Sequence, residues 1–165
     1  PHAAAFVAAR EGGLALTAHA GEVAGPQRVR EVLDFGVRRV AHGVVAAADP
    51  ELLAILRARN ITLDLCPTSN VQAAVVRSLA DHPISALHRA GVSVTISTDD
   101  RTVSSITLSE ELARCVTDAG LSRSELAAIS VNAFRRAFAP PALLGAVTAE
   151  ATRAWEAWVS EPLRI

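Results

Sequence analysis

Several residue types are scarce in this sequence, and each absence narrows the possibilities. The chain of 165 residues has no methionine and no tyrosine, and only 4% of it is aromatic. Half of the residues are hydrophobic nonetheless, so alanine, valine and leucine must fill a core that a chain of this length can build. Because the chain lacks methionine and begins with Pro1, we expect it to be part of a longer protein.

The net charge is close to zero, the apolar runs are short, and the chain has only two cysteines. The 16 basic and 17 acidic residues nearly cancel, and no basic block occurs, so we expect no nucleic-acid partner. Charged residues interrupt the apolar runs before the ~20 residues that a membrane helix needs, so we expect no membrane partner. Cys66 and Cys115 follow no metal or redox spacing, which favours a reducing, cytoplasmic location.

Apolar runs alternate with helical patterns along the chain. We expect strands at about 14–18, 38–41, 61–65 and 92–97. The predicted helices cover residues 2–11, 26–35, 50–59, 83–90, 108–119, 122–138 and 142–159. Strands separated by helices favour a parallel sheet with right-handed crossovers. Asp49-Pro50 is expected to open one helix, and Ser122 with Glu125 forms a capping box that opens another.

A polar signature follows each predicted strand. His19 and Glu22 follow the first strand, His42 follows the second, and Asp99-Asp100 follows the fourth. The third strand ends in a Cys-Pro turn at Cys66. Polar residues at the carboxyl ends of strands in a βα series are typical of an α/β-barrel active site. Histidines and carboxylates together indicate a metal-assisted hydrolase.

Each of these residues also has a purely structural interpretation. His19 and His42 could be loop histidines, and the paired aspartates could cap the following helix. Cys66 is more easily explained as a structural residue than as a ligand, because thiolates beside a catalytic water are unusual. The three other histidines, His2, His82 and His88, are expected to face solvent or to satisfy the core, and His2 lies outside the residues that the structure describes.

Taken together and in order, the motifs resemble the C-terminal half of the adenosine deaminase family of metal-dependent amidohydrolases. The resemblance covers roughly residues 14 to 140, and the helix with Ser130-Val-Asn-Ala-Phe134 also matches. The matching motifs are His19-Ala-Gly-Glu22, His42-Gly43, Cys66-Pro-Thr-Ser-Asn70 and Ser97-Thr-Asp-Asp100.

This resemblance implies an α/β fold, the C-terminal half of a (β/α)8 TIM barrel. A complete barrel typically has ~250 residues, so residues 1–165 would form one partial barrel domain with extra C-terminal helices. The missing N-terminal half of the barrel is then an expected partner. Alone, the chain would leave its outer strands unpaired, and we expect the inner face to be lined by Leu16, Leu63, Leu65 and Ile96.

The resemblance also implies a reaction, the zinc-dependent hydrolysis of adenosine or a related 6-aminopurine nucleoside to the inosine analogue and ammonia. His19 and Asp99 would bind zinc. Glu22 would protonate a purine ring nitrogen, and His42 would orient and electrostatically support the attacking hydroxide. The 165 residues alone are expected to be inactive.

The resemblance also implies how the substrate is recognised. Asp100 would hydrogen-bond another ring nitrogen, and Gly21, which permits the turn beside Glu22, joins it in the expected substrate-binding set. Two features depart from the family pattern. No His-x-His occurs, and Arg101 replaces the usual proline. A deaminase for adenine, AMP or a modified adenosine, and a non-catalytic purine-binding relative, therefore stay open as alternatives.

Overall fold

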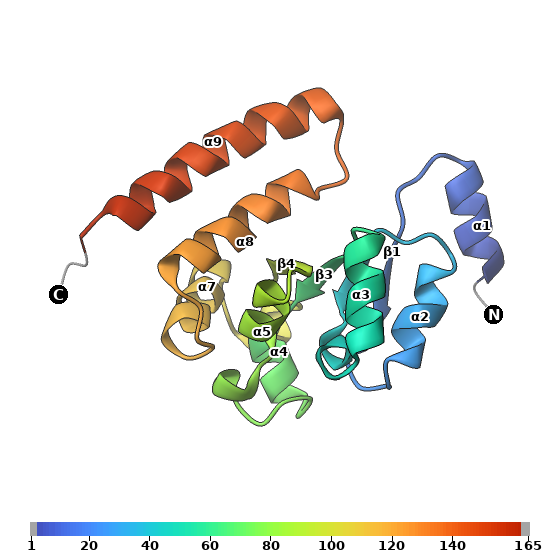
Figure 1. Ribbon diagram of the computed structural model, residues 1–165, viewed down its shortest axis with the longest axis horizontal. Helices are drawn as coiled ribbons and strands as arrows, with labels where there is room; N and C mark the ends of the chain where they lie inside the picture. Colours follow the sequence, from blue (N-terminus) through green and yellow to red (C-terminus); the bar gives the residue numbers. More distant parts are fainter. Residues whose placement is uncertain (1–2, 163–165) are drawn as a thin grey trace.

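The fold is a half-barrel of four parallel strands wrapped by helices (Figure 1), and the computed structural model describes residues 3–162. Its strands are β1 (Thr17–Ala20), β2 (Arg39–His42), β3 (Thr62–Leu65) and β4 (Ser93–Ile96). Its helices are α1 (Ala3–Glu11), α2 (Gln27–Leu33), α3 (Pro50–Ala58), α4 (Pro67–Gln72), α5 (Ile84–Arg89), α6 (Arg101–Ser104), α7 (Leu108–Thr117), α8 (Arg123–Arg135) and α9 (Pro141–Ser160), with 3-10 turns η1 (Val44–Ala48) and η2 (Leu79–Asp81).

The sheet confirms the predicted parallel arrangement. Its order is β1-β2-β3-β4, and all three neighbouring pairs are parallel. Helices connect successive strands, as parallel pairing requires. Consequently the carboxyl ends of all four strands lie at one edge of the sheet, and β1 and β4 are its outer strands.

The first strand begins later than the sequence predicted. Strand pairing was expected from residue 14, whereas β1 covers Thr17–Ala20. The reason is local, because Gly13 has a φ of 77° and the amide of Leu14 still donates to the carbonyl of Ala9, at 3.0 Å. The chain is therefore closing helix α1 at this point. Pairing with the next strand starts only at Leu16, whose carbonyl accepts from Arg38.

One face of the sheet is apolar and covered by helices. The strand register aligns Val40, Leu63 and Val94, which are at most 2% exposed. These residues form one core with the inward side chains of α2, α3 and α5. Our expectation for the inner face of the barrel was therefore wrong for Leu63 and Leu65, which lie on this helix-covered face. It was also wrong for Ile96, which is in register with Leu65, and for Leu16, which belongs to the same core. Because side chains alternate between the two faces of a sheet, the apolar residues of each strand lie on one face, and the helices pack against that face.

The opposite face, which is open to the inside of the half-barrel, is polar. Arg39 forms a two-bond ion pair with Asp64, with Nε to Oδ2 at 3.0 Å and Nη2 to Oδ1 at 2.5 Å. Thr95 donates to the same carboxylate at 2.5 Å. Hydrogen-bonded polar side chains therefore line this face, instead of the leucines that we expected.

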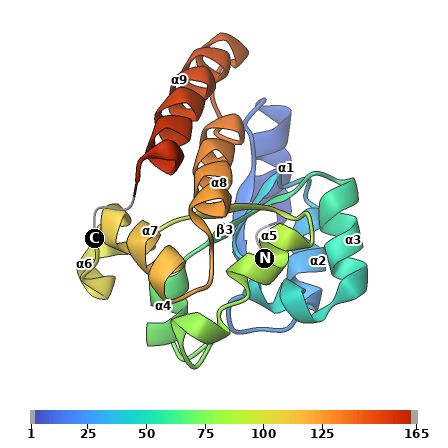
Figure 2. The ribbon, with the colours of Figure 1, turned by 60° about the vertical axis from the view of Figure 1, so that its left-hand side comes forward.

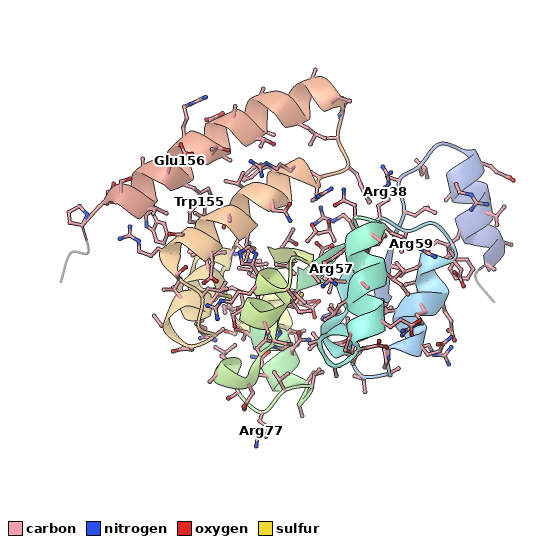
Figure 3. The ribbon with its side chains drawn as sticks, viewed as in Figure 1. Arg38, Arg57, Arg59, Arg77, Trp155 and Glu156 are labelled. Atoms are coloured by element: carbon pink, nitrogen blue, oxygen red, sulfur yellow. The ribbon has the colours of Figure 1, made fainter. Side chains whose placement is uncertain are left out.

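Helices α8 and α9 form an antiparallel pair (Figure 2), and α8 packs against β4. Asn132 of α8 donates to the carbonyl of Val94 at 2.9 Å, so α8 covers part of the outer edge of β4. Trp155 points from α9 toward α8 (Figure 3), and its ring meets that of Trp158 edge to face with centroids 5.2 Å apart. Both indoles pack against the core, which confirms the extra C-terminal helices.

Capping explains where several helices begin. The predicted caps are present, because Asp49 accepts from the amide of Leu52 at 2.9 Å and Ser122 and Glu125 form a capping box. Caps of this kind each contribute about 1 kcal/mol. The sequence did not predict the short helices α4 and α6, which lie in the connections after β3 and β4. Among the described residues 3–162, no helix combines the length and apolarity needed to cross a membrane.

Candidate active site

The predicted site residues converge at the carboxyl edge of the sheet. His19 lies near the end of β1 and His42 at the end of β2, and their ring centroids are 4.4 Å apart. Nε2 of His42 lies 3.9 Å from Oδ2 of Asp99, and Nδ1 lies 3.7 Å from Oε1 of Glu22. Three side chains, from two distant parts of the sequence, therefore surround the imidazole of His42.

Unusual backbone conformations bring two of these residues into place. His42 has a φ of 67° and Asp99 has a φ of 58°. Such left-handed conformations cost a non-glycine residue on the order of 1 kcal/mol or more, and they cluster at functional sites. His42 thereby turns out of the strand and buries its ring, which is 2% exposed.

Gly21 shapes the turn between His19 and Glu22. Its φ is 69°, and a Cβ at this position would lie only 2.5 Å from Cγ2 of Val29 and 3.0 Å from Cγ2 of Val45. Only glycine fits both the conformation and the space. The structure thus explains Gly21 by packing, and its substrate-binding role remains a prediction.

Glu22 is held beside both histidines. Its Oε2 lies 2.9 Å from Nε2 of His19, and its side chain is 17% exposed while that of His19 is 62% exposed. A ring nitrogen either carries a proton or offers a lone pair. Metal binding through Nε2 of His19 would therefore replace this hydrogen bond.

The environment of His42 favours the neutral imidazole. Burial lowers its pKa below the ordinary value, and the nearby charge of His19 lowers it further. The carboxylates of Glu22 and Asp99 oppose that shift without reversing it. At neutral pH the ring therefore has one proton, whose position decides whether each nitrogen donates or accepts.

The two adjacent aspartates have different surroundings. Oδ2 of Asp99 accepts from Oγ of Ser69 at 2.7 Å, on the side of the site. Oδ1 of Asp100 accepts from the amides of Thr102 and Val103, at 2.8 and 2.9 Å, and so caps α6. The capping alternative is confirmed for Asp100, and its contact with substrate stays a prediction.

Sequence reasoning missed two buried residues that support this cluster. Asn70 is fully buried, and its Nδ2 lies 3.1 Å from Nδ1 of His42. His82 is 3% exposed, and its Nε2 lies 3.2 Å from Oδ1 of Asn70. The expectation that His82 satisfies the core is thus confirmed. Asn70 stood inside the Cys-Pro motif, but nothing in its spacing indicated which side chain it would contact.

Cys66 behaves as a structural residue. It is 4% exposed, and burial raises its pKa to about 12, so the thiol stays protonated at neutral pH. Its Sγ donates weakly to the carbonyl of Asp64, at 3.7 Å. The structural interpretation therefore fits better than a thiolate ligand.

The donor set suits a borderline divalent ion such as zinc, which binds imidazole nitrogen and carboxylate oxygen. His19 and Asp99 are the two members that face open space, with side chains 62% and 42% exposed. They fit as zinc ligands by type. Catalytic zinc sites have three protein ligands, so at least one more must come from beyond these two. Among the described residues, donor atoms of His42, Cys66 and Asp99 also lie close enough together to bind one ion. However, the His42 ring is buried and hydrogen-bonded to Asn70, and the Cys66 thiol is buried and protonated.

A large cleft opens beside the cluster. Its volume is about 1010 Å³, and its walls come from α1, β1 and α2. His19, Gly21 and Glu22 lie in this wall, so the predicted acid and the predicted ligand border the same space. The cleft can admit a molecule of nucleoside size.

Comparison with known proteins decides the family. The model of the family described as adenosine deaminase matches residues 1–147. The chain belongs to the adenosine deaminase family. The family resemblance of the motifs is thereby confirmed.

Individual relatives carry several deaminase names. Adenosine deaminase of Serratia proteamaculans (strain 568) is 39% identical over 134 residues, which cover 81% of this chain and 40% of that protein. Aminodeoxyfutalosine deaminase of Acidothermus cellulolyticus (strain ATCC 43068 / DSM 8971 / 11B) is 43% identical over 118 residues, covering 67% of this chain and 33% of that protein. The chain therefore spans well under half the length of these relatives, in their C-terminal part.

Structural comparison gives the same result for the fold. The crystal structure of adenine deaminase from Arthrobacter aurescens superposes with a TM-score of 0.88 at 29% sequence identity. The match covers 96% of this chain and 48% of that protein. This confirms the prediction of half an α/β barrel.

Proposed function

We propose that the protein containing this chain catalyses the hydrolytic deamination of adenosine or a related 6-aminopurine nucleoside, giving the inosine analogue and ammonia. The observation that carries the proposal is the convergence of His19, Glu22, His42 and Asp99 at one edge of the sheet. Membership in a deaminase family and the names of the relatives support it.

Zinc is the metal that we propose for this site, with His19 and Asp99 as two of its ligands. When bound, zinc lowers the pKa of water so that hydroxide can attack at neutral pH. Both side chains are partly exposed, so further ligands can reach the same ion. The N-terminal half of the barrel, with a His-x-His pair, is the proposed source of those ligands.

Glu22 is the proposed acid. Its carboxyl group lies between two imidazoles and borders the cleft, so it can deliver a proton to a ring nitrogen of a bound purine. Protonation of the ring makes the amino-bearing carbon more electrophilic. Water then adds to that carbon, the C–N bond breaks and ammonia leaves.

His42 and Asp100 complete the proposed machinery. His42 is buried between Glu22 and Asp99, where it can orient the attacking oxygen without being solvated. One oxygen of Asp100 caps α6, and the other can accept a hydrogen bond from a second ring nitrogen. Gly21 lines the cleft beside Glu22, where its backbone can contact the substrate.

Two further proposals concern the rest of the barrel and the location of the protein in the cell. The polar inner face and the outer strand β1 fit a complementary half-barrel that closes the sheet. Cys66 and Cys115 are both free and buried thiols, which fits the proposed cytoplasmic location.

The test is to clone the complete reading frame, purify the zinc-loaded protein and measure ammonia release. The panel contains adenosine, adenine, AMP and an N6-modified adenosine. We expect turnover of at least one aminopurine, and we expect Glu22→Gln to reduce kcat by at least ~10²-fold with most zinc retained. The matched control is Glu51→Gln, which removes an exposed carboxylate that pairs with Arg30 and lies outside the cleft.

Two outcomes would contradict the proposal. Near-normal turnover in Glu22→Gln would remove this residue from the mechanism. Purine binding without ammonia release, in a protein whose preceding sequence lacks His-x-His, would support the non-catalytic relative. The substrate with the highest kcat/KM would decide among the deaminase alternatives, including the effect of Arg101.

A further inference from the structure

A buried chain of hydrogen bonds connects helix α5 to the imidazole of His42. The amide of Ile84 lies 3.2 Å from Nδ1 of His82, and Nε2 of His82 lies 3.2 Å from Oδ1 of Asn70. Nδ2 of Asn70 then lies 3.1 Å from Nδ1 of His42. His42, Asn70 and His82 are 2%, 0% and 3% exposed, so water does not compete along this path.

The first member of the chain fixes the direction of all the others. A backbone N–H can only donate, so Nδ1 of His82 accepts from Ile84 and its single proton lies on Nε2. That proton is donated to Oδ1 of Asn70. The amide nitrogen of Asn70 consequently faces His42 and donates to Nδ1. The proton of neutral His42 must therefore lie on Nε2.

We propose that Asn70 and His82 are positioning residues that hold His42 in the Nε2–H tautomer. In this tautomer Nε2 carries a proton and has no lone pair, so it donates a hydrogen bond and cannot accept one. Nε2 faces Oδ2 of Asp99 across 3.9 Å. His42 thus presents a hydrogen-bond donor to the space beside Asp99, where the proposed function puts the attacking oxygen.

Two further features support this assignment. Burial alone lowers the pKa of His82 to about 4, so at neutral pH the ring has the one proton that the chain requires. Asn70 is also fixed through its backbone, because its amide donates to the carbonyl of Cys66 at 2.9 Å and its carbonyl accepts from Val75 at 2.9 Å. The side-chain amide cannot easily rotate away from His42.

The same amide reaches the proposed acid. Nδ2 of Asn70 lies 3.5 Å from Oε1 of Glu22, on the side opposite to the His19 contact. One buried amide group therefore orients both the imidazole and the carboxyl group. Loss of Asn70 should disturb two functional groups, and loss of His82 should disturb them only through Asn70.

The test reads the tautomer directly. The complete protein is labelled with [15N]histidine, and the His42 signals are assigned through a His42→Gln variant. We expect a protonated Nε2 and an unprotonated Nδ1 at pH 7.5, both with zinc and after its removal. Asn70→Asp replaces the donating amide by an oxygen, and we expect the His42 proton to move to Nδ1. His82→Phe keeps a ring of similar size without the donor, and we expect a mixture of tautomers.

Kinetics and stability distinguish positioning from simple packing. We expect Asn70→Asp to lower kcat by about 10²-fold and His82→Phe by about 10-fold, with KM changed less than kcat in both. The matched control is Asn132→Asp, which alters another amide that bonds to a strand, at Ser93 and Val94. It should leave the His42 signals unchanged even if it lowers the melting temperature.

The inference rests on the proposed function only for its kinetic part. An Nδ1–H tautomer in the unmodified protein, or a tautomer that survives Asn70→Asp, would overturn it whatever the enzyme does. Conversely, the expected tautomer in a protein that turns over no aminopurine would leave the positioning intact and overturn the proposed function.

Discussion

Asp99 and Asp100 are adjacent in sequence, but their carboxylates accept hydrogen bonds from different parts of the chain. Asp99 turns toward Ser69 and His42 through a left-handed backbone, with φ at 58°. Asp100 instead caps the first turn of α6. Asp99 is therefore a candidate metal ligand, whereas Asp100 caps a helix.

Exchanging each carboxylate for an amide should separate their roles. In the complete protein, Asp99→Asn should lower zinc affinity by at least ~10-fold, because zinc favours an ionised carboxylate. Asp100→Asn should keep zinc and stability, since asparagine caps a helix about as well as aspartate. Metal analysis, thermal unfolding and ammonia release measure all three properties.

The outcome for Asp100 is the informative one. If it contacts substrate as proposed, Asp100→Asn lowers kcat/KM while zinc content and melting temperature stay normal. Unchanged turnover in that variant would limit Asp100 to the cap that the structure describes.

The ion pair of Arg39 with Asp64 should stabilise the inner face of the sheet. Their side chains are only 19% and 17% exposed, and Thr95 donates to the same carboxylate. Asp64→Asn would leave a half-buried guanidinium without its partner and should cost about 2 kcal/mol. Chemical denaturation of the complete protein checks this value.

A surface pair serves as the control for that measurement. Arg77 and Asp81 are also hydrogen-bonded, but their side chains are 89% and 40% exposed. Asp81→Asn should cost less than ~1 kcal/mol, because solvent screens exposed pairs. Equal losses in the two variants would contradict a special role for the inner pair.

The sequence predicted most of the fold because its elements are periodic and well capped. The strand ending at His42 and the helix opened by Ser122 lie within a few residues of their predicted bounds. Helices α4 and α6 were missed because they are short, at 6 and 4 residues, and have too few turns to display a period. The faces of the sheet were assigned wrongly because alternation alone does not say which side the helices cover.

Convergence of the candidate site residues could be predicted where position along a strand determines it. His19, His42 and Asp99 meet because parallel strands end at one edge. Asn70 and His82 could not be found this way. Their contact joins the start of the connection between β3 and β4 to its middle, 12 residues later, and depends on the exact path of the loop between them.

Gly21 should be irreplaceable for two separate reasons. Gly21→Ala would put a methyl group 2.5 Å from Val29 in a left-handed backbone, and we expect a loss of about 3 kcal/mol. Gly13 has a similar φ of 77°, but a methyl group there would meet nothing within 4 Å. Gly13→Ala therefore isolates the backbone cost, about 1 kcal/mol. Denaturant unfolding of both variants measures the difference, and equal losses would show that packing at Gly21 is relaxed.

Acid should weaken the contact of Asp49 with Arg30. The guanidinium hydrogen bond and the capped amide of Leu52 lower the pKa of Asp49 to about 2, from an ordinary 3.8. Because the folded-state pKa is depressed, this contribution is complete well above pH 4 and is lost as pH falls toward 2. Asp49→Asn keeps the cap and removes the charge. Its melting temperature should be lower than that of the unmodified protein at pH 7, and the gap should close in acid. A gap that is constant with pH would contradict the argument.

The 165 residues expressed alone should self-associate through β1, lack deaminase activity and bind zinc weakly. The argument from an apolar inner wall no longer holds, since that face is polar, but the outer strands remain. Asn132 of α8 already engages β4, so β1 is the freer edge. Thr17→Lys places a charge on that edge and should shift the chain toward monomer in sedimentation, whereas Ala142→Lys on the exposed first turn of α9 should not. A monomer at all concentrations, with stoichiometric zinc and normal turnover, would show that the chain needs no complementary half.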